Sequence, residues 1–469
     1  MKTLSLGTLG RKSLRRGVVG CRWSSTVLSL ALRRRLRTMS PTLRCAATSP
    51  ISAIALSIFT LASWIATAWC VPTRSSPYRN CWLGARRRRG RNPTCRMAYN
   101  TSAGSSWSAS EMDISVVVTT HNQQERLRLV LAGLRGQIAS VAHFEVVVVD
   151  DGCSDGTAEM LAEVSRQMDL KIVRLRPNEG RCMARNRGVE AAAGAFVAFL
   201  DGDALPHPQW LQGHIEALKQ GGRASLLCGA GYSLPGLEYL QDPQRGTPMA
   251  DKTPSVVREY LRIHRQDLIL TEDMVLGAFD RIEGRAVIGW YPFPELETLQ
   301  EQITELFVQH PDSPIGWLGF FPNNGAVLRE AFLAVGGFDP DMAFSEGWDL
   351  AYRLQQHGCR PCFVPEARAY HLYHYHDFSD PIKAREETLA PQRAMRYMER
   401  KHSDPKLLLF HFWYASIWPD PLLPEETLLR DLIEFHHAYM HGSTSRLRDL
   451  RILLDHHPTW AESSEARIP

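Results

Sequence analysis

The chain has 469 residues, enough for two or three domains with a large buried core, so folding requires neither a disulfide nor a structural metal. Its net charge of +4 hides a division: residues 1–110 hold 19 Lys or Arg and no acid, whereas the remainder holds 35 basic and 50 acidic residues. An acidic body argues against sequence-independent binding to nucleic acid, which needs a basic face. The ten cysteines form no small-domain disulfide pattern, so we expect a reducing compartment for the body.

The basic segment 1–110 is expected to be largely disordered and contains one uncharged run, residues 51–71. At about 1.5 Å per helical residue this run would just cross a bilayer, which predicts a single membrane anchor. The arginines on its two sides slightly favour a body on the cytoplasmic side. Two other interpretations stay open: an Arg- and Ser-rich targeting segment, or sequence upstream of a true start at Met112.

From residue 113 onward, short apolar runs alternate with amphipathic stretches. The apolar runs predict buried strands at 114–119, 144–149, 171–175 and 195–200. Apolar residues at three- and four-residue spacing predict helices at 125–134, 157–168 and 181–193. This alternation predicts a parallel, Rossmann-like α/β sheet covered on both faces, with ligands bound beyond the carboxyl ends of its strands.

The rest of the body carries fewer signals. Two further helices are expected at 208–220 and 255–270, and a compact pattern resumes over 323–369. From about residue 384 the chain is predicted to be helical to its end, with aromatic and His-rich faces but no chemical motif. We therefore expect a helical C-terminal extension at 381–469.

Polar segments follow the predicted strands where a ligand would bind. Asp201 and Asp203, separated by one glycine, suit a hard divalent cation that shares its oxygen ligands with a diphosphate, although a surface turn can have the same composition. The segment 150–157 can hold a base and ribose or simply cap the next helix. Taken alone, the segment 178–186 predicts a loop that leads into a helix.

Taken in order, these segments resemble the family 2 glycosyltransferases. The first half of the match is SVVVTTHN at 115–122, VVDDGCSDGT at 148–157 and NEGRCMARNRGVEAAAGAFVAFLDGD at 178–203. The second half is NNGA at 323–326, GGFD at 336–339, EGWDL at 346–350 and RL at 353–354. The resemblance covers roughly 113–376, and the motifs are specific as an ordered set.

The resemblance implies a GT-A fold for 111–380, with a mixed sheet, a donor half at about 111–230 and an acceptor half at about 231–380. It implies contacts with a nucleotide-sugar donor from a set of six residues: Thr120, Asn122, Asp150, Asp151, Arg181 and Asp201. It also implies a divalent cation, Mn²⁺ or Mg²⁺, held by Asp201, Asp203 and one histidine, for which we take His371. The nearby His374 and His376 stay alternatives.

One position departs from the family pattern. The family usually has Glu-Asp where this chain has Glu346-Gly347, and that aspartate is the usual general base. Glu346 or Asp349 can supply a carboxylate instead, and we favour Glu346. The competing interpretation is that Glu346 merely begins the helix expected at 348–357, where the helix dipole favours an acidic side chain.

Two further groups of residues have competing interpretations. Cys359 and Cys362 can form a zinc site with His371, but the spacing is shorter than in zinc fingers, so we rank this site low. Six aromatic residues can stack on acceptor sugars, although packing in the core is the commoner use of such side chains. They are Trp290, Tyr291, Phe293, Trp317, Phe320 and Phe321.

The sequence thus predicts a metal-dependent, inverting hexosyltransferase that uses a nucleotide-diphosphate sugar, with UDP taken from the resemblance. The acceptor stays open among a polysaccharide, a lipid carrier, a protein and a small molecule, and no nucleic acid is expected. Because nucleotide sugars are made in the cytosol of most cells, we expect a cytoplasm-facing domain, tethered to a membrane through 51–71. The alternatives are a catalytically impaired donor-binding protein, motivated by Gly347, and a sugar nucleotidyltransferase.

Overall fold

The computed structural model describes residues 113–138, 144–249, 255–289, 294–342, 344–375, 381–418, 420 and 422–457. All of these residues lie in one unit of the chain, 76–469. Several residues named above lie outside the described ranges: the segment 1–110 with its run 51–71, Met112, Trp290, Tyr291, Phe293 and His376.

The predicted location is corrected by the structure. No helix in the described ranges is both long and apolar enough to cross a membrane, which overturns the prediction of a cytoplasm-facing domain tethered to a membrane. The run 51–71 that suggested the tether is not among the residues that the structure describes.

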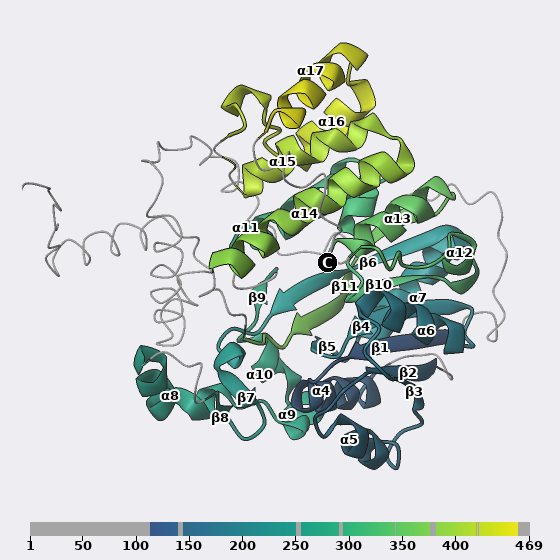
Figure 1. Ribbon diagram of the computed structural model, residues 1–469. Helices are drawn as coiled ribbons and strands as arrows, with labels where there is room; N and C mark the ends of the chain where they lie inside the picture. Colours follow the sequence, from purple (N-terminus) through teal and green to yellow (C-terminus); the bar gives the residue numbers. More distant parts are fainter. Residues whose placement is uncertain are drawn as a thin grey trace, which may run out of the picture. The chain divides into compact units, whose positions relative to one another are not determined.

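Within the described ranges, nine strands form one mixed sheet at the centre of the unit (Figure 1). They are β1 (Ile114–Thr120), β2 (Phe144–Asp151), β3 (Lys171–Leu175), β4 (Phe196–Asp201), β5 (Ala204–Pro206), β6 (Ser225–Ser233), β9 (Val287–Ile288), β10 (Asn324–Leu328) and β11 (Arg360–His371). Their order is β3-β2-β1-β4-β10-β6-β11-β5, with β9 beside β6. A separate hairpin pairs β7 (Leu240–Asp242) with β8 (Thr247–Pro248).

The first four strands form the parallel half that the alternating pattern predicted. β1 pairs in parallel with β2 on one side and with β4 on the other, and β3 continues the sheet beyond β2. Val116, Val117 and Val118 of β1 are almost completely buried, as expected for a strand covered on both faces. The second half is not purely parallel, because β10 runs antiparallel to both β4 and β6.

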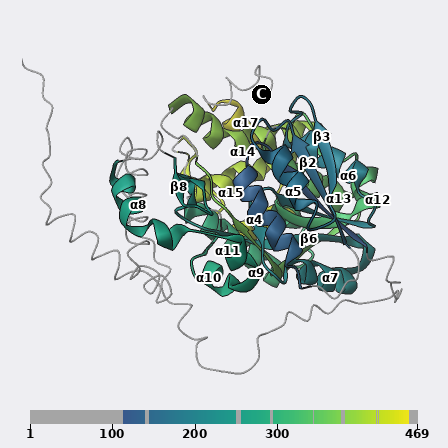
Figure 2. The same ribbon diagram turned by 90° about the horizontal axis from the view of Figure 1, so that it is seen from below.

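Helices cover both faces of the sheet, as Figures 1 and 2 show. In the first half of the unit they are α4 (Gln124–Arg135), α5 (Thr157–Val164), α6 (Arg181–Ala191) and α7 (Trp210–Gly221). Farther along lie α8 (Ser255–Leu268), α9 (Glu272–Gly277), α10 (Phe279–Glu283), α11 (Pro294–Gln309), α12 (Arg329–Ala334) and α13 (Glu346–Gln356). The predicted helices are all present, although α5 ends at Val164 and α13 begins two residues early, at Glu346.

The C-terminal region is helical, as predicted, as far as the described residues extend. It contains α14 (Pro381–His402), α15 (Leu409–Ile417), α16 (Leu432–His441) and α17 (Thr444–Asp455). Phe410, Trp413 and Phe435 are fully buried there, and the indole of Trp413 donates a hydrogen bond of 2.9 Å to Gln302 of α11. These helices therefore share a core with the body of the unit.

Candidate active site

The ends of three neighbouring parallel strands bring the predicted donor residues to one edge of the sheet. Thr120 ends β1 and lies in register with Asp150 of β2, and Thr119 lies in register with Asp201 at the end of β4. This is the edge at which open α/β sheets bind ligands. The prediction placed these carboxylates just after the strands, whereas they occupy the last strand residues.

The two carboxylates at the end of β2 shape the loops around them. Asp150 accepts hydrogen bonds from the Cys153 amide at 2.8 Å and from the Arg176 guanidinium at 3.1 Å. Although burial raises the pKa of Asp150, these donors outweigh it and hold the pKa below its usual value. Asp151 accepts from the amides of Glu179 at 2.7 Å and Gly180 at 3.1 Å. Asp151 thereby fixes the turn that leads into α6.

The remaining predicted donor residues lie around the same turn. Asn122 has a left-handed backbone, with φ of 53°, and its amide oxygen accepts from the Ser154 amide at 2.8 Å. The Thr120 hydroxyl is buried and has no hydrogen-bond partner among the described residues. Arg181 is the first residue of α6 and is exposed. A helix start that carries an exposed arginine suits an anionic ligand such as a diphosphate.

The two aspartates of the 201–203 turn face different partners. Asp203 lies beside His371 and His374, and each imidazole Nε2 is 3.5 Å from Asp203 Oδ2. Among the described residues these three form the one group able to hold a metal ion, with ligand atoms all within 4.8 Å of one another. The sequence named Asp203 and His371 as metal ligands but could not choose His374, because only the pairing of β11 with β5 brings that segment over Asp203.

Asp201, also predicted as a metal ligand, faces a buried arginine. Arg185 of α6 donates to Asp201 Oδ1 at 2.8 Å and to Glu346 Oε1 at 2.6 Å, and its guanidinium lies 5.3 Å from the ring centroid of Phe338. Burial raises the pKa of Asp201, and the charge of Arg185 offsets part of this effect. The Glu346 side chain, at the start of α13, is only 5% exposed. Arg185 thus connects the 201–203 turn to the candidate base.

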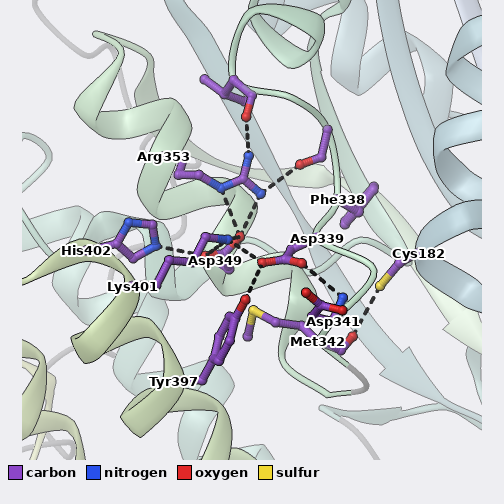
Figure 3. A network of polar contacts seen from close by, with 12 residues as sticks. Cys182, Phe338, Asp339, Asp341, Met342, Asp349, Arg353, Tyr397, Lys401 and His402 are labelled. Carbon is purple, nitrogen blue, oxygen red and sulfur yellow. Dashed lines mark hydrogen bonds and ion pairs between the residues drawn. The ribbon is translucent and has the colours of Figure 1, made fainter. Parts of the chain in front are cut away.

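Asp349, the alternative base, belongs to a different network (Figure 3). It is fully buried and accepts hydrogen bonds from Arg353 at 2.6 Å, Lys401 at 3.0 Å and His402 at 2.8 Å. Burial raises the pKa of Asp349, but these donors outweigh it and lower the pKa to about 2. Lys401 also reaches Asp339 of the GGFD motif. Sequence reasoning missed Lys401 and His402 because both belong to α14 and no local pattern marks them.

The lower-ranked candidates lie elsewhere. Cys359 and Cys362 are buried near the start of β11, and neither belongs to the metal-binding group found among the described residues. Trp317 and Phe320 are fully buried and pack in the core, which leaves Phe321 partly accessible.

With this geometry established, the comparison with known sequences identifies the family. The sequence model described as "Glycosyl transferase family 2" matches residues 115–288. The match supports a family 2 glycosyltransferase domain in this part of the chain. The predicted family and GT-A fold class are therefore confirmed, and the enzyme class that the family names is a glycosyltransferase. The matched residues include the donor loops and the 201–203 turn, whereas Glu346 and His371 lie beyond them.

Curated relatives carry glycosyltransferase or polysaccharide-synthase names. The chain is 37% identical over 106 residues to glycosyltransferase AglE of Haloferax volcanii, which covers 22% of this chain and 35% of that protein. It is 28% identical over 254 residues to a validoxylamine A glucosyltransferase of Streptomyces hygroscopicus, covering 52% of each. It is 25% identical over 261 residues to chondroitin synthase of Escherichia coli, covering 55% of this chain and 34% of that enzyme. The chain spans about half or less of the length of these relatives.

Solved structures also resemble the chain, at low identity. A mannosyltransferase from Pyrobaculum calidifontis in complex with GDP-Man and Mn²⁺ is 18% identical, with a TM-score of 0.36 over 75% of this chain and 76% of that one. Residues 1–349 of S. aureus TarS in complex with UDP are 14% identical, with a TM-score of 0.36 over 73% of this chain and 90% of that one.

Proposed function

We propose that this chain is a metal-dependent, inverting glycosyltransferase that moves a sugar from a nucleotide-diphosphate donor, UDP being the first candidate, to an acceptor hydroxyl. One observation carries the proposal. At the edge of the sheet where open α/β folds bind ligands, Asp203, His371 and His374 form a group that could hold a cation, and Arg185 links the neighbouring Asp201 to Glu346. In this proposal the site for the diphosphate would adjoin the candidate base. Residues 111–230 would supply most donor contacts and 231–380 the acceptor side.

The proposed donor contacts come from Thr120, Asn122, Asp150, Asp151, Arg181 and Asp201. The Thr120 hydroxyl supports this assignment because it has no hydrogen-bond partner among the described residues. Arg181 supports it because its side chain is exposed at the start of α6. Asp150 and Asp151 would act mainly by holding the loops in shape, since their oxygens already accept hydrogen bonds from the protein.

The donor set of the proposed cation site suits Mn²⁺ better than Mg²⁺. It combines one carboxylate with two imidazoles, whereas Mg²⁺ prefers oxygen ligands alone. Burial raises the pKa of Asp203, but His371, His374 and Arg126 together outweigh this effect and hold the pKa below its usual value, which favours the carboxylate form that a cation would bind. When bound, such a cation neutralises charge on the departing diphosphate.

Glu346 is the proposed general base. Inversion by a single displacement requires a carboxylate that takes the acceptor proton as the hydroxyl oxygen attacks the anomeric carbon. Asp349 is poorly suited to this role because Arg353, Lys401 and His402 already bind its oxygens. Arg185 binds Oε1 of Glu346, and in this proposal Oε2 would take the acceptor proton.

A second candidate function is a donor-binding protein without transferase activity. Two observations favour it: glycine occupies position 347, and Glu346 is buried in an ion pair with Arg185. In this case the nucleotide sugar would bind at the same edge of the sheet and would not turn over.

The deciding experiment measures UDP release from a panel of UDP-sugars by the full-length chain with Mn²⁺, with Mg²⁺ and with EDTA. The proposal predicts metal-dependent release that Glu346→Gln reduces by at least about 100-fold, in line with the loss of general-base catalysis. Glu330→Gln is the matched control, because the Glu330 side chain is 78% exposed and lies outside the site. UDP binding without release would favour the donor-binding protein, and pyrophosphate release would indicate nucleotidyl transfer.

A further inference from the structure

A buried arginine lies next to the proposed cation site and binds backbone carbonyls. Arg126, on the first turn of α4, is 8% exposed. Its Nε donates to the Leu372 carbonyl at 2.8 Å, and its Nη2 donates to the carbonyls of Tyr373 at 3.0 Å, Leu237 at 3.0 Å and Leu240 at 3.2 Å. One guanidinium thus joins α4, the 237–240 segment and the end of β11.

Two of these carbonyls, those of Leu372 and Tyr373, belong to the segment that directly follows β11 and indicate what Arg126 does. Leu372 and Tyr373 are the two residues between His371 and His374, the histidines that face Asp203. The Leu372 amide donates to the Asp203 carbonyl at 2.7 Å, so this short segment is held from both sides. A shift of its backbone would move both imidazoles relative to the Asp203 carboxylate.

Burying a guanidinium without a close carboxylate partner is costly. Burial lowers the pKa of Arg126, and the more distant charges of Asp203 and Glu238 offset part of this effect. A lysine could not replace it directly, because the planar guanidinium offers donors in a fixed fork that an ammonium lacks. The geometry therefore requires the shape of this side chain as well as its charge.

We propose that Arg126 is a positioning residue that holds the 371–374 segment so that both imidazoles face Asp203. This inference rests on the proposed function, because it assumes that Asp203, His371 and His374 bind a divalent cation. Side chains that orient metal ligands typically change metal affinity by 10- to 100-fold when they are replaced.

The direction of the change in cation affinity distinguishes a positioning role of Arg126 from an effect of its charge. A positive side chain near a cation site weakens cation binding by repulsion, so neutralising it should tighten the binding if charge alone mattered. If Arg126 instead positions the histidines, both Arg126→Met and the charge-preserving Arg126→Lys should weaken binding.

The test measures Mn²⁺ affinity of the full-length chain by electron paramagnetic resonance of free Mn²⁺, and UDP affinity in EDTA by calorimetry. We expect Mn²⁺ binding to weaken at least 10-fold in Arg126→Lys and Arg126→Met, with UDP binding in EDTA unchanged. Arg128→Met is the matched control on the same helix, since Arg128 pairs with Glu163 away from the site, and it should bind Mn²⁺ like the wild type.

The possible failures can be told apart. Wild-type affinity in Arg126→Lys, or tighter binding in Arg126→Met, would overturn the positioning role while leaving the proposed cation site in place. Absence of Mn²⁺ binding by the wild type would overturn the cation site itself, and with it this inference. Thermal unfolding of each variant identifies a folding defect, and if Arg126→Met does not fold, Arg126→Lys decides.

Discussion

At the scale of single residues, a Cβ atom built on Gly347 would lie 2.5 Å from Pro322 Cδ and 3.0 Å from its Cγ. Alanine is normally favoured over glycine inside a helix by about 1 kcal/mol. At this position we expect alanine to be less stable than glycine: Gly347→Ala should destabilise the protein by about 1–3 kcal/mol through overpacking. Gly347→Asp should cost more and should not increase UDP release, although it restores the residue usual in the family. Urea unfolding and the release assay measure both effects.

The Pro322→Ala background is the control for this prediction. If Pro322 is the obstacle, the cost of Gly347→Ala should fall in that background, which a double-mutant cycle quantifies. A stable Gly347→Asp protein with raised activity would contradict the prediction. The sequence alone reveals that an aspartate is missing, but it cannot reveal the reason, because Pro322 reaches Gly347 only through the packing of α13 on the preceding loop.

At the scale of elements, α14 is attached to α13 through charges that the sequence did not reveal. The helical pattern after residue 384 predicted that a helix would form, since periodicity is a local signal. It could not predict that Lys401 and His402 would bind Asp349, because these residues meet only after the chain has folded back on itself. For the same reason the sequence favoured Glu346 over Asp349 as the base without revealing the partners of Asp349.

This attachment predicts a specific loss of stability for Asp349→Asn. Removing the charge of a fully buried carboxylate leaves its cationic partners uncompensated, which should cost about 3–5 kcal/mol. The pKa of Asp349 is about 2 in the folded state, below the unfolded value of about 3.9, so its contribution is present above about pH 4 and is lost as the pH falls toward 2. In urea unfolding, the wild type should therefore be more stable than Asp349→Asn at pH 7. The difference between their free energies of unfolding should decrease as the pH falls.

Asp312→Asn is the matched control for Asp349→Asn. The Asp312 side chain is 70% exposed, so its replacement should change the free energy of unfolding by less than about 0.5 kcal/mol. An Asp349→Asn protein that is as stable as the wild type but releases no UDP would contradict our assignment and would identify Asp349 as the base.

At the scale of the whole molecule, the sequence predicts the first half of the sheet better than the second. β1 to β4 alternate with helices, and the right-handed connections of such units leave few arrangements open. The later strands are separated by long helical segments, and β10 enters between β4 and β6 with antiparallel pairing. That insertion depends on long-range contacts, and so does the pairing of β11 with β5 that brings His371 beside Asp203.

The contact between α11 and the C-terminal helices predicts a pH dependence for the described unit. His310, just after α11, stacks on His436 of α16, with ring centroids 4.1 Å apart, and the Ser313 hydroxyl lies 2.8 Å from His436 Nδ1. Burial, and then the neighbouring His310, His437 and His441, lower the pKa of His436. The folded state therefore binds fewer protons than the unfolded state near pH 6.5, and stability should fall as the pH drops through that value.

Repulsion between two imidazolium rings at this distance is on the order of 1 kcal/mol in a largely solvated setting. His310→Gln removes it, so the wild type should lose about that much more stability than the variant between pH 8 and pH 5.5, measured by urea unfolding. His357→Gln is the control, because His357 is exposed and directly follows the C-terminal end of α13. The stability of this variant should depend on pH in the same way as that of the wild type. Hydrogen exchange should then rise in α16 at pH 5.5 in the wild type and stay low in His310→Gln. Identical pH curves for the wild type and His310→Gln would mean that the stacked pair accepts a proton without loosening α16 from α11.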